Sequence, residues 1–222
     1  MHTGKTKGIG YFMKIALING SPKGKNSASA GLLADLKLHM GNQAVFTDIE
    51  LCKNSVSEEL LTELARTDVW VLACPLYVDG IPSHLLSCLI QLEKAGLSSK
   101  KTAVYGIVNC GFYEGIQAAP ALSILENWCA KAGLLWGGGI GVGGGGALSQ
   151  IPDVKGGHGP KAPIYKALQA LADTIFHAKT QENHYVSIAF PRFLYKMAAE
   201  AGWRQMIKRN GGKRSDLGKR IL

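Results

Sequence analysis

Two spacings of apolar residues alternate along this chain of 222 residues. Short, nearly continuous apolar runs are typical of strands buried on both faces of a sheet. Apolar residues three or four positions apart are typical of helices that cover such a sheet. The predicted strands are residues 14–19, 44–51, 68–74, 102–109 and 134–142. The predicted helices are residues 28–40, 57–66, 82–94, 115–131 and 161–177.

This alternation predicts an α/β fold with a doubly wound, five-stranded parallel sheet. Five strands suit the flavodoxin-like strand order 2-1-3-4-5. We expect one main domain over residues 13–180, because the strand and helix patterns fall within it. Residues 1–12 lack the apolar core of a signal peptide and are expected to be a disordered N-terminal extension. Residues 181–222 form a C-terminal helical extension.

Composition and charge restrict the compartment and the binding partners expected for this domain. Apolar residues make up 46% of the chain, yet no apolar run approaches the roughly 20 residues needed to span a bilayer. The five cysteines show no C-x-x-C pair, which favours reduced thiols and a cytoplasmic protein. The net charge of +9 includes +7 from Arg192 onward, whereas residues 15–191 carry −1. A main body of near-neutral charge argues against nucleic-acid binding.

Residues 19–27, Asn-Gly-Ser-Pro-Lys-Gly-Lys-Asn-Ser, connect the first predicted strand to the first predicted helix. A turn of small and hydroxyl residues into a helix N-terminus presents backbone N–H groups that suit a phosphate. The segment has neither the Gly-Lys-Ser/Thr of a triphosphate loop nor the G-x-G-x-x-G of a dinucleotide loop, so a phosphate monoester is the better match. The candidate ligands are Ser21, Lys23, Asn26 and Ser27. The alternative is an ordinary loop that ends in a helix cap.

Two further segments follow the third and fourth predicted strands. In an open parallel sheet, ligands bind beyond the carboxyl ends of the strands where the strand order reverses. One segment carries two prolines and a tyrosine, and the other sets glycine beside aromatic residues, so both suit a planar ring. The candidate residues are Pro75, Leu76, Tyr77, Val78, Asp79 and Gly80, and then Asn109, Cys110, Gly111, Phe112 and Tyr113. The alternatives are a rigid turn into a helix and a set of core or dimer-contact residues.

Together the three segments resemble motifs of the NAD(P)H-dependent FMN reductases of the flavodoxin-like superfamily. The matching motifs are Asn-Gly-Ser-Pro-Lys-x-x-Asn-Ser, Pro-Leu-Tyr-Val-Asp-Gly-Ile-Pro and Asn-Cys-Gly-Phe-Tyr-Glu. The resemblance covers about residues 13–178. It implies that Ser21, Lys23, Asn26 and Ser27 in the first segment hold the FMN phosphate. It implies that residues 75–80 and 109–113 hold the flavin ring from opposite sides. It also implies a homodimer, because relatives often complete the flavin pocket across a subunit interface.

The implied function follows from the implied cofactor. FMN takes a hydride from a nicotinamide at N5 and passes it to an acceptor, so no catalytic side chain and no metal site are predicted. We expect an FMN-dependent NAD(P)H oxidoreductase that acts on a small acceptor such as a quinone, a flavin, or a nitro or azo compound. The alternative is a flavodoxin-like electron carrier that holds FMN without oxidising a nicotinamide. A third alternative is a structural domain that has lost its ligand.

Two departures from the family pattern and one incidental motif bear on this expectation. Leu86 and Ile90-Gln91 stand where many relatives carry a lysine and an Asp-Arg pair. Only Cys52 stands where cluster-binding relatives have a compact cysteine motif, so we expect a flavin-only member. Residues 139–144 match G-x-G-x-x-G but precede no helical pattern, which predicts a flexible glycine-rich loop near the flavin mouth.

Residues 191–222 differ in character from the main domain. Apolar residues recur near helical spacing among lysines and arginines, which predicts a basic amphipathic helix. We expect an accessory helix that packs on its own domain or on a second subunit. The alternative is weak contact with an anionic membrane surface.

Overall fold

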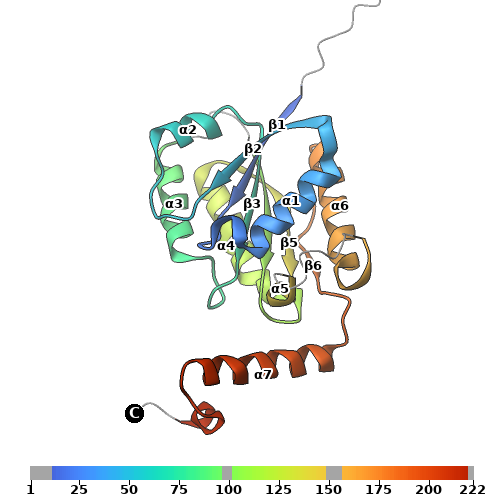
Figure 1. Ribbon diagram of the computed structural model, residues 1–222. Coiled ribbons are helices and arrows are strands. Elements are labelled where there is room, and N and C mark those ends of the chain that lie inside the picture. Colours follow the sequence, from blue (N-terminus) through green and yellow to red (C-terminus); the bar gives the residue numbers. More distant parts are fainter. Residues whose placement is uncertain (1–11, 97–101, 149–156, 220–222) are drawn as a thin grey trace, which may run out of the picture. The chain divides into compact units, whose positions relative to one another are not determined.

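A computed structural model describes residues 12–96, 102–148 and 157–219 of the chain. It contains two compact units, of which the first ends at Ile188 and the second begins at Ala189. The first unit is built on a six-stranded parallel sheet with the order β2-β1-β3-β4-β5-β6 (Figure 1). The strands are β1 (Met13–Asn19), β2 (Ala44–Glu50), β3 (Val69–Pro75), β4 (Ala103–Asn109), β5 (Leu135–Val142) and β6 (His184–Val186). The expected N-terminal extension lies almost wholly outside the described residues.

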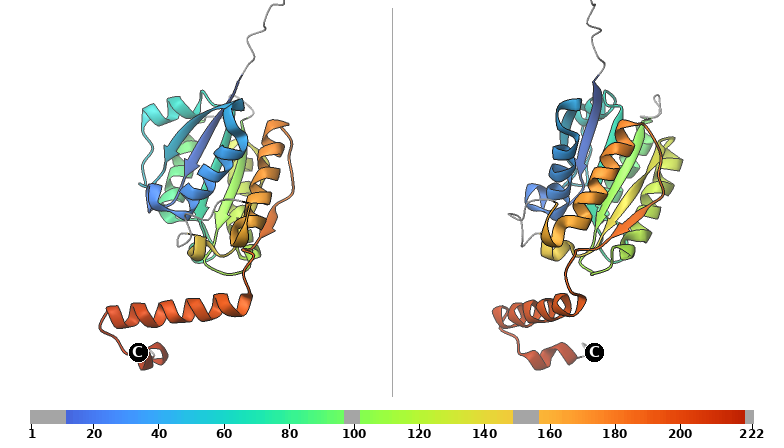
Figure 2. Two further views of the ribbon diagram at one scale, coloured as in Figure 1. Left: turned by 45° about the vertical axis from the view of Figure 1, so that its right-hand side comes forward. Right: turned by 90° about the vertical axis from the view of Figure 1, so that its right-hand side faces the viewer.

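The helices of the first unit form a layer on each face of this sheet. They are α1 (Ala28–Met40), α2 (Glu58–Leu64), α3 (Ser83–Lys94), α4 (Ala119–Ala132), α5 (Gly145–Leu148) and α6 (Ala162–Phe176). Single 3-10 turns are η1 (Gly24–Asn26), η2 (Gly41–Gln43), η3 (Gly115–Ala118) and η4 (Gly159–Lys161). α1 and α6 pack together on one face, and α3 and α4 pack together on the other (Figure 2). The predicted α/β fold with a parallel sheet is confirmed.

The prediction of five strands is wrong at one edge of the sheet, where β6 pairs with β5. The pairing is parallel and joins Ile140 to His184 and Val142 to Val186. A strand of three residues contains no apolar run that could be recognised in the sequence. Because β6 belongs to the first unit, this unit extends past the domain boundary expected at residue 180.

Two tryptophans organise the core between the sheet and α3 and α4. The rings of Trp70 in β3 and Trp128 in α4 stack with their centroids 6.5 Å apart. Trp70 Nε1 donates to Thr67 Oγ1 at 2.8 Å, and Trp128 Nε1 donates to the carbonyl oxygen of Leu89 in α3 at 2.9 Å. Aromatic pairs of this kind contribute about 0.5–1.5 kcal/mol beyond their buried area, and both buried indole N–H groups are satisfied. The pair therefore anchors α4 to the centre of the sheet.

The glycine-rich segment predicted to be a flexible loop instead forms β5 and its tightly packed end. The ring of Tyr105 in β4 covers Gly137, where any Cβ atom would overlap it. A Cβ atom at Gly143 would likewise overlap the carbonyl oxygen of Tyr113. The glycines thus permit close approach of neighbouring chain segments, and the prediction of flexibility is wrong for residues 139–144. Residues 149–156, which continue that segment, lie outside the described residues.

The second unit consists of α7 (Arg192–Arg209) and the turn η5 (Arg214–Gly218). No residue of α7 is buried, and Phe193, Leu194 and Trp203 are exposed. Consecutive helical residues point about 100° apart, so the neighbours Phe193, Leu194 and Tyr195 face three different directions. The predicted helix is present, but its predicted amphipathic character is wrong, because apolar residues surround its axis. No helix in the described part of the chain is both long and apolar enough to cross a membrane.

Candidate functional site

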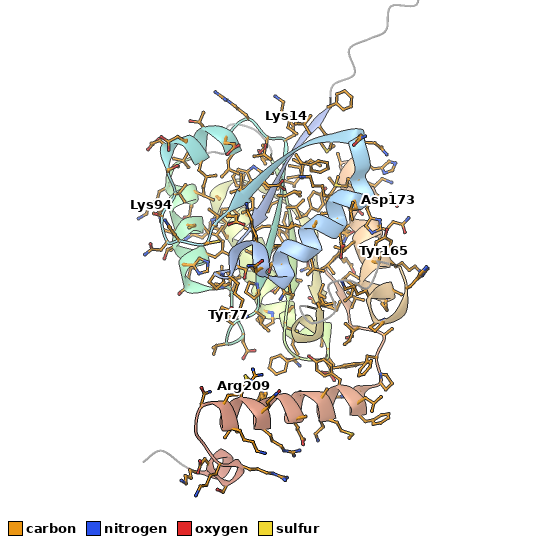
Figure 3. The ribbon with its side chains drawn as sticks, viewed as in Figure 1. Lys14, Tyr77, Lys94, Tyr165, Asp173 and Arg209 are labelled. Atoms are coloured by element: carbon orange, nitrogen blue, oxygen red, sulfur yellow. The ribbon has the colours of Figure 1, made fainter. Side chains whose placement is uncertain are left out.

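Three loops meet at the edge of the sheet toward which the strands point. β1, β3 and β4 end at Asn19, Pro75 and Asn109, and their pairing brings these ends side by side. The N–H of Gly20 donates to the carbonyl oxygen of Ala73 at 2.8 Å, and the N–H of Leu76 donates to that of Asn109 at 2.8 Å. The structure therefore brings the three predicted segments together, with Tyr77 at this edge (Figure 3).

The loop after β1 is folded around the side chain of Asn19. Asn19 Oδ1 accepts from the N–H of Ser21 at 3.1 Å, and Asn19 Nδ2 donates to the carbonyl oxygen of Gly24 at 3.0 Å. Ser21 is 2% exposed, and its Oγ accepts from the N–H of Lys23 at 3.4 Å. Of the predicted phosphate ligands, Ser21 therefore shapes the loop from inside, whereas Lys23 and Asn26 are exposed.

Ser27 caps the N-terminus of α1. Its backbone is extended, and its Oγ accepts from the N–H of Ala30 at 3.1 Å. A cap satisfies one of the N–H groups that the first turn leaves without helical partners. The other N–H groups of a first turn, with the positive end of the helix dipole, favour an anion such as a phosphate. The sequence analysis named a helix cap as the alternative to a phosphate site. The structure shows the cap, and the phosphate contact of Ser27 stays a prediction.

Cys52 supports this loop from the neighbouring strand end and was not predicted from the sequence. It follows β2, and its thiol donates to the carbonyl oxygen of Ser21 at 3.3 Å. Burial, followed by the negative charge of Glu50, raises the pKa of Cys52, so its proton stays available for this hydrogen bond. The only signal in the sequence was its position after the second predicted strand, which lies beside the first in the expected order.

The loop after β3 makes a tight turn at Val78 and Asp79. Tyr77 and Gly80 exchange backbone hydrogen bonds of 2.9 and 3.0 Å, and the two residues between them have φ angles of 47° and 58°. Two positive φ angles are typical of a type I′ turn, which favours Asn-Gly, and the left-handed region is a strained conformation for a β-branched valine. Val78 is fully exposed and Tyr77 is 44% exposed. The strained turn thus holds an aromatic side chain outward at the edge, as strained backbone often does at functional sites.

The loop after β4 has an inward half and an outward half. Asn109 is 7% exposed and accepts a hydrogen bond from Ser29. Cys110 is 1% exposed, its thiol points to the carbonyl oxygens of Phe112 and Glu114, and burial raises its pKa. Phe112 is exposed, and a Cβ atom at Gly111 would meet open space.

The fifteen predicted residues therefore divide by orientation. Buried residues that shape the site are Ser21, Pro75, Asn109 and Cys110. Residues that are exposed or partly exposed at its surface are Lys23, Asn26, Ser27, Leu76, Tyr77, Val78, Asp79, Gly80, Gly111, Phe112 and Tyr113. Among the described residues, no group of three or more His, Cys, Asp or Glu is arranged to hold a metal ion.

Several solved structures share this fold. An NADH:FMN oxidoreductase in its apo form matches with 18% identity and a TM-score of 0.56 over 77% of this chain and 91% of its own. The Trp repressor binding protein from Bacillus subtilis matches with 17% identity and a TM-score of 0.50 over 59% of this chain and 84% of its own. A short-chain flavodoxin associated with a non-canonical PDU bacterial microcompartment matches with 12% identity and a TM-score of 0.50 over 76% of this chain and 100% of its own. The fold is therefore flavodoxin-like. No protein-family model and no curated protein matches the sequence.

Proposed function

We propose that the chain is an FMN-dependent NAD(P)H oxidoreductase that acts on a small acceptor such as a quinone, a flavin, or a nitro or azo compound. The observation that carries the proposal is the convergence of three loops where the strand order reverses between β1 and β3. This is the position at which open parallel sheets bind ligands. Exposed Tyr77 and Phe112 come from two of these loops, and the third leads into the N-terminus of α1.

The residues present fit FMN in two parts. The phosphate would lie at the N-terminus of α1, with Lys23, Asn26 and Ser27 around it. The ring would lie between Tyr77 and Phe112, and the open space at Gly111 permits close approach to the backbone. Ser21 and Asn109 would position the two loops from inside, because each is buried and hydrogen-bonded there.

When bound, FMN supplies the hydride chemistry. The chain's own residues bind and orient the cofactor and keep water from its covered side. The thiol of Cys110, in the loop after β4, is buried and has a raised pKa, so it remains a protonated structural group and not a nucleophile.

Absorption spectroscopy of the purified full chain tests this function. We expect the chain to take up FMN in stoichiometric amount and the flavin absorbance to bleach on anaerobic addition of NADPH or NADH. Failure to take up FMN overturns the proposal. Uptake of FMN without bleaching by either nicotinamide favours the electron carrier instead.

A pair of asparagine variants tests the phosphate position. Asn26 and Asn54 are both exposed and both follow a lysine, but Asn54 lies outside the three loops. Hydrogen bonds to charged groups contribute about 1.5–3 kcal/mol, so Asn26→Leu should weaken FMN binding by roughly 10-fold or more. Asn54→Leu should leave FMN binding unchanged. Equal FMN affinity of the two variants would remove Asn26 from the site.

We also propose that the chain forms a homodimer. Leu86 and Ile90 on α3 and Ile116 in η3 are large apolar residues that are 41–51% exposed. Leu86 and Ile90 are one helical turn apart, and adjoining exposed apolar side chains often lie in subunit interfaces. Sedimentation velocity should give a dimer for the wild-type chain and a monomer for Leu86→Glu, whereas a monomeric wild-type chain contradicts the proposal.

A further inference from the structure

A groove of about 430 Å³ lies between α1 and α6, and most of its lining belongs to none of the three loops. Its apolar wall includes Leu32, Leu148 and Ile164, and its polar groups include Lys25, Asp35 and Lys161. The volume lies within the range of about 300–1,000 Å³ that is usual for small-molecule sites. The groove also reaches Asn26 and Ser27, so it opens toward the proposed flavin phosphate.

Gly31 lines this groove. It lies inside α1, and a Cβ atom built on it would have no neighbour within 4 Å. Glycine within a helix costs roughly 0.5–1 kcal/mol relative to alanine. Neither a positive φ angle nor a close neighbour requires glycine here. The absence of a side chain at position 31 therefore leaves space beside α1, and it costs helix stability.

The charges in the groove are of both signs. Lys25 and Lys161 line it together with the first residues of α1, and lysines at a helix N-terminus favour a phosphate. Asp35 is partly buried, and burial raises its pKa while Lys161 and His39 act in the opposite direction. A carboxylate oxygen in such a wall can accept hydrogen bonds from hydroxyl or amino groups.

Tyr165 supplies an aromatic surface in the same groove. It lies on α6 (Figure 3). Its ring contacts that of His39, with the centroids 3.9 Å apart. A ring held by a neighbouring ring gives a preformed flat wall, which suits a planar heterocycle. The groove thus combines cations for a phosphate, an acceptor for hydroxyl or amino groups, and a flat apolar wall.

We propose that this groove binds the adenosine-phosphate end of the nicotinamide donor and that it favours NADPH over NADH. The inference rests on the proposed function. The extra phosphate of NADPH lies between Lys25 and Lys161, the ribose or adenine donates to Asp35, and the adenine ring packs on Ile164 and Tyr165. The groove begins beside the flavin phosphate, so a donor held there can extend toward the flavin ring at the sheet edge.

Calorimetric titration of the full chain with 2′,5′-ADP tests the groove directly. The probe carries the adenine, the ribose, the 2′-phosphate and one 5′-phosphate of NADPH but no nicotinamide, so its binding is measured without turnover. We expect Gly31→Leu to weaken 2′,5′-ADP binding at least 10-fold because leucine fills the groove, while Gly31→Ala, with only one added carbon, retains most of it. Leucine and alanine both favour the helix, so the melting temperature of each variant should equal or exceed that of the wild type.

A matched pair of lysine variants tests the phosphate contact. Lys161 lines the groove, whereas Lys166 is exposed on α6 and does not. We expect Lys161→Gln to weaken 2′,5′-ADP binding at least 10-fold and Lys166→Gln to leave it unchanged. 5′-ADP should bind at least 10-fold more weakly than 2′,5′-ADP, and equal affinity for the two overturns the preference for NADPH. Inorganic phosphate should compete only at far higher concentration.

The outcomes separate the groove from the flavin site. If FMN binds but 2′,5′-ADP binds wild type and Gly31→Leu equally, or binds neither, the groove proposal is overturned and the proposed function stands. If FMN does not bind, the proposed function fails and the assignment of the groove to a nicotinamide donor fails with it. Loss of 2′,5′-ADP binding in Gly31→Leu with unchanged FMN binding supports the groove.

Discussion

The hydroxyl of Ser29 donates a hydrogen bond of 2.7 Å to Oδ1 of Asn109, and both residues are buried. The bond joins the first turn of α1 to the carboxyl end of β4. Two loops of the candidate site are thereby fixed to each other from inside. Asn109 was predicted to contact the flavin ring, but the structure turns its side chain toward the protein interior.

Removal of this hydroxyl should destabilise the fold. Ser29→Ala leaves a buried carbonyl oxygen without its donor, which costs about 1–3 kcal/mol. We expect urea unfolding to give a free energy of unfolding that is lower than that of the wild type by this amount. Ser87→Ala is the control, because Ser87 Oγ donates to the carbonyl oxygen of Ser83 near the surface of α3. Equal losses in the two variants would mean that the Ser29 hydroxyl has no special part in joining the loops.

The turn after β3 should gain stability when its first central residue suits a left-handed conformation. This conformation costs most side chains about 1–2 kcal/mol, and asparagine tolerates it best after glycine. Val78 is fully exposed, so its replacement loses no packing. We expect Val78→Asn to raise the free energy of unfolding by about 1 kcal/mol and Val78→Ala to raise it less. A Val78→Asn chain no more stable than Val78→Ala would contradict this account.

Asp35 should make stability depend on pH. Burial raises its folded-state pKa, so the folded chain binds this proton more tightly than the unfolded chain. Proton binding by Asp35 contributes fully to the free energy of unfolding below the unfolded pKa of roughly 3.9. This contribution is lost as pH rises through the folded-state pKa of Asp35. We therefore expect Asp35→Asn to melt at a higher temperature than the wild type at pH 7, with the difference shrinking as the pH falls toward 4.

The control for Asp35 is an exposed aspartate with an ion pair. Asp48 lies 2.7 Å from Lys37 Nζ and its side chain is 69% exposed, so Asp48→Asn should change the melting temperature little. A lower melting temperature of Asp35→Asn at pH 7 would show that the carboxylate is net stabilising. If Asp35 binds the donor as proposed, the stabilised Asp35→Asn variant should also bind 2′,5′-ADP more weakly.

The second unit should bind anionic vesicles only through charge. Residues from Arg192 onward carry a net +7, but the apolar residues of α7 surround its axis and offer no single face for insertion. We expect the full chain to co-sediment weakly with phosphatidylserine vesicles at low salt, to be released at high salt, and not to bind neutral vesicles. Binding to neutral vesicles would show that apolar insertion contributes.

A truncated chain completes that experiment. It should end at Ile188, which is 3% exposed and packs beside Gly144, so a cut at Ser187 would remove a core residue. The truncated chain should not bind the vesicles. Equal binding of the two chains would exclude contact between the second unit and the membrane.

The elements that the sequence predicted are those with a local signal. The predicted helix over residues 28–40 matches α1 residue for residue, because its leucines recur at helical spacing and Ser27 supplies a cap. Continuous apolar runs identified β1, β3 and β4 to within two residues at each end. Alternation of strand and helix implied a parallel sheet, in which the carboxyl ends of the strands share one edge. The sequence pattern therefore predicted that the three loops lie together.

Only the tertiary structure decided what depends on distant segments. β6 exists because three residues meet the free edge of β5. Tyr185 and Val186 favour strands, but three residues are too few for a recognisable pattern. Cys52 contacts the loop at Ser21 because β2 lies beside β1. The side chain of Asn109 points inward because the hydroxyl of Ser29 donates a hydrogen bond to it there. Periodicity reports which face of an element is apolar, but the direction of a polar side chain in a loop depends on the neighbour that satisfies it. That neighbour is set by the packing of the whole sheet.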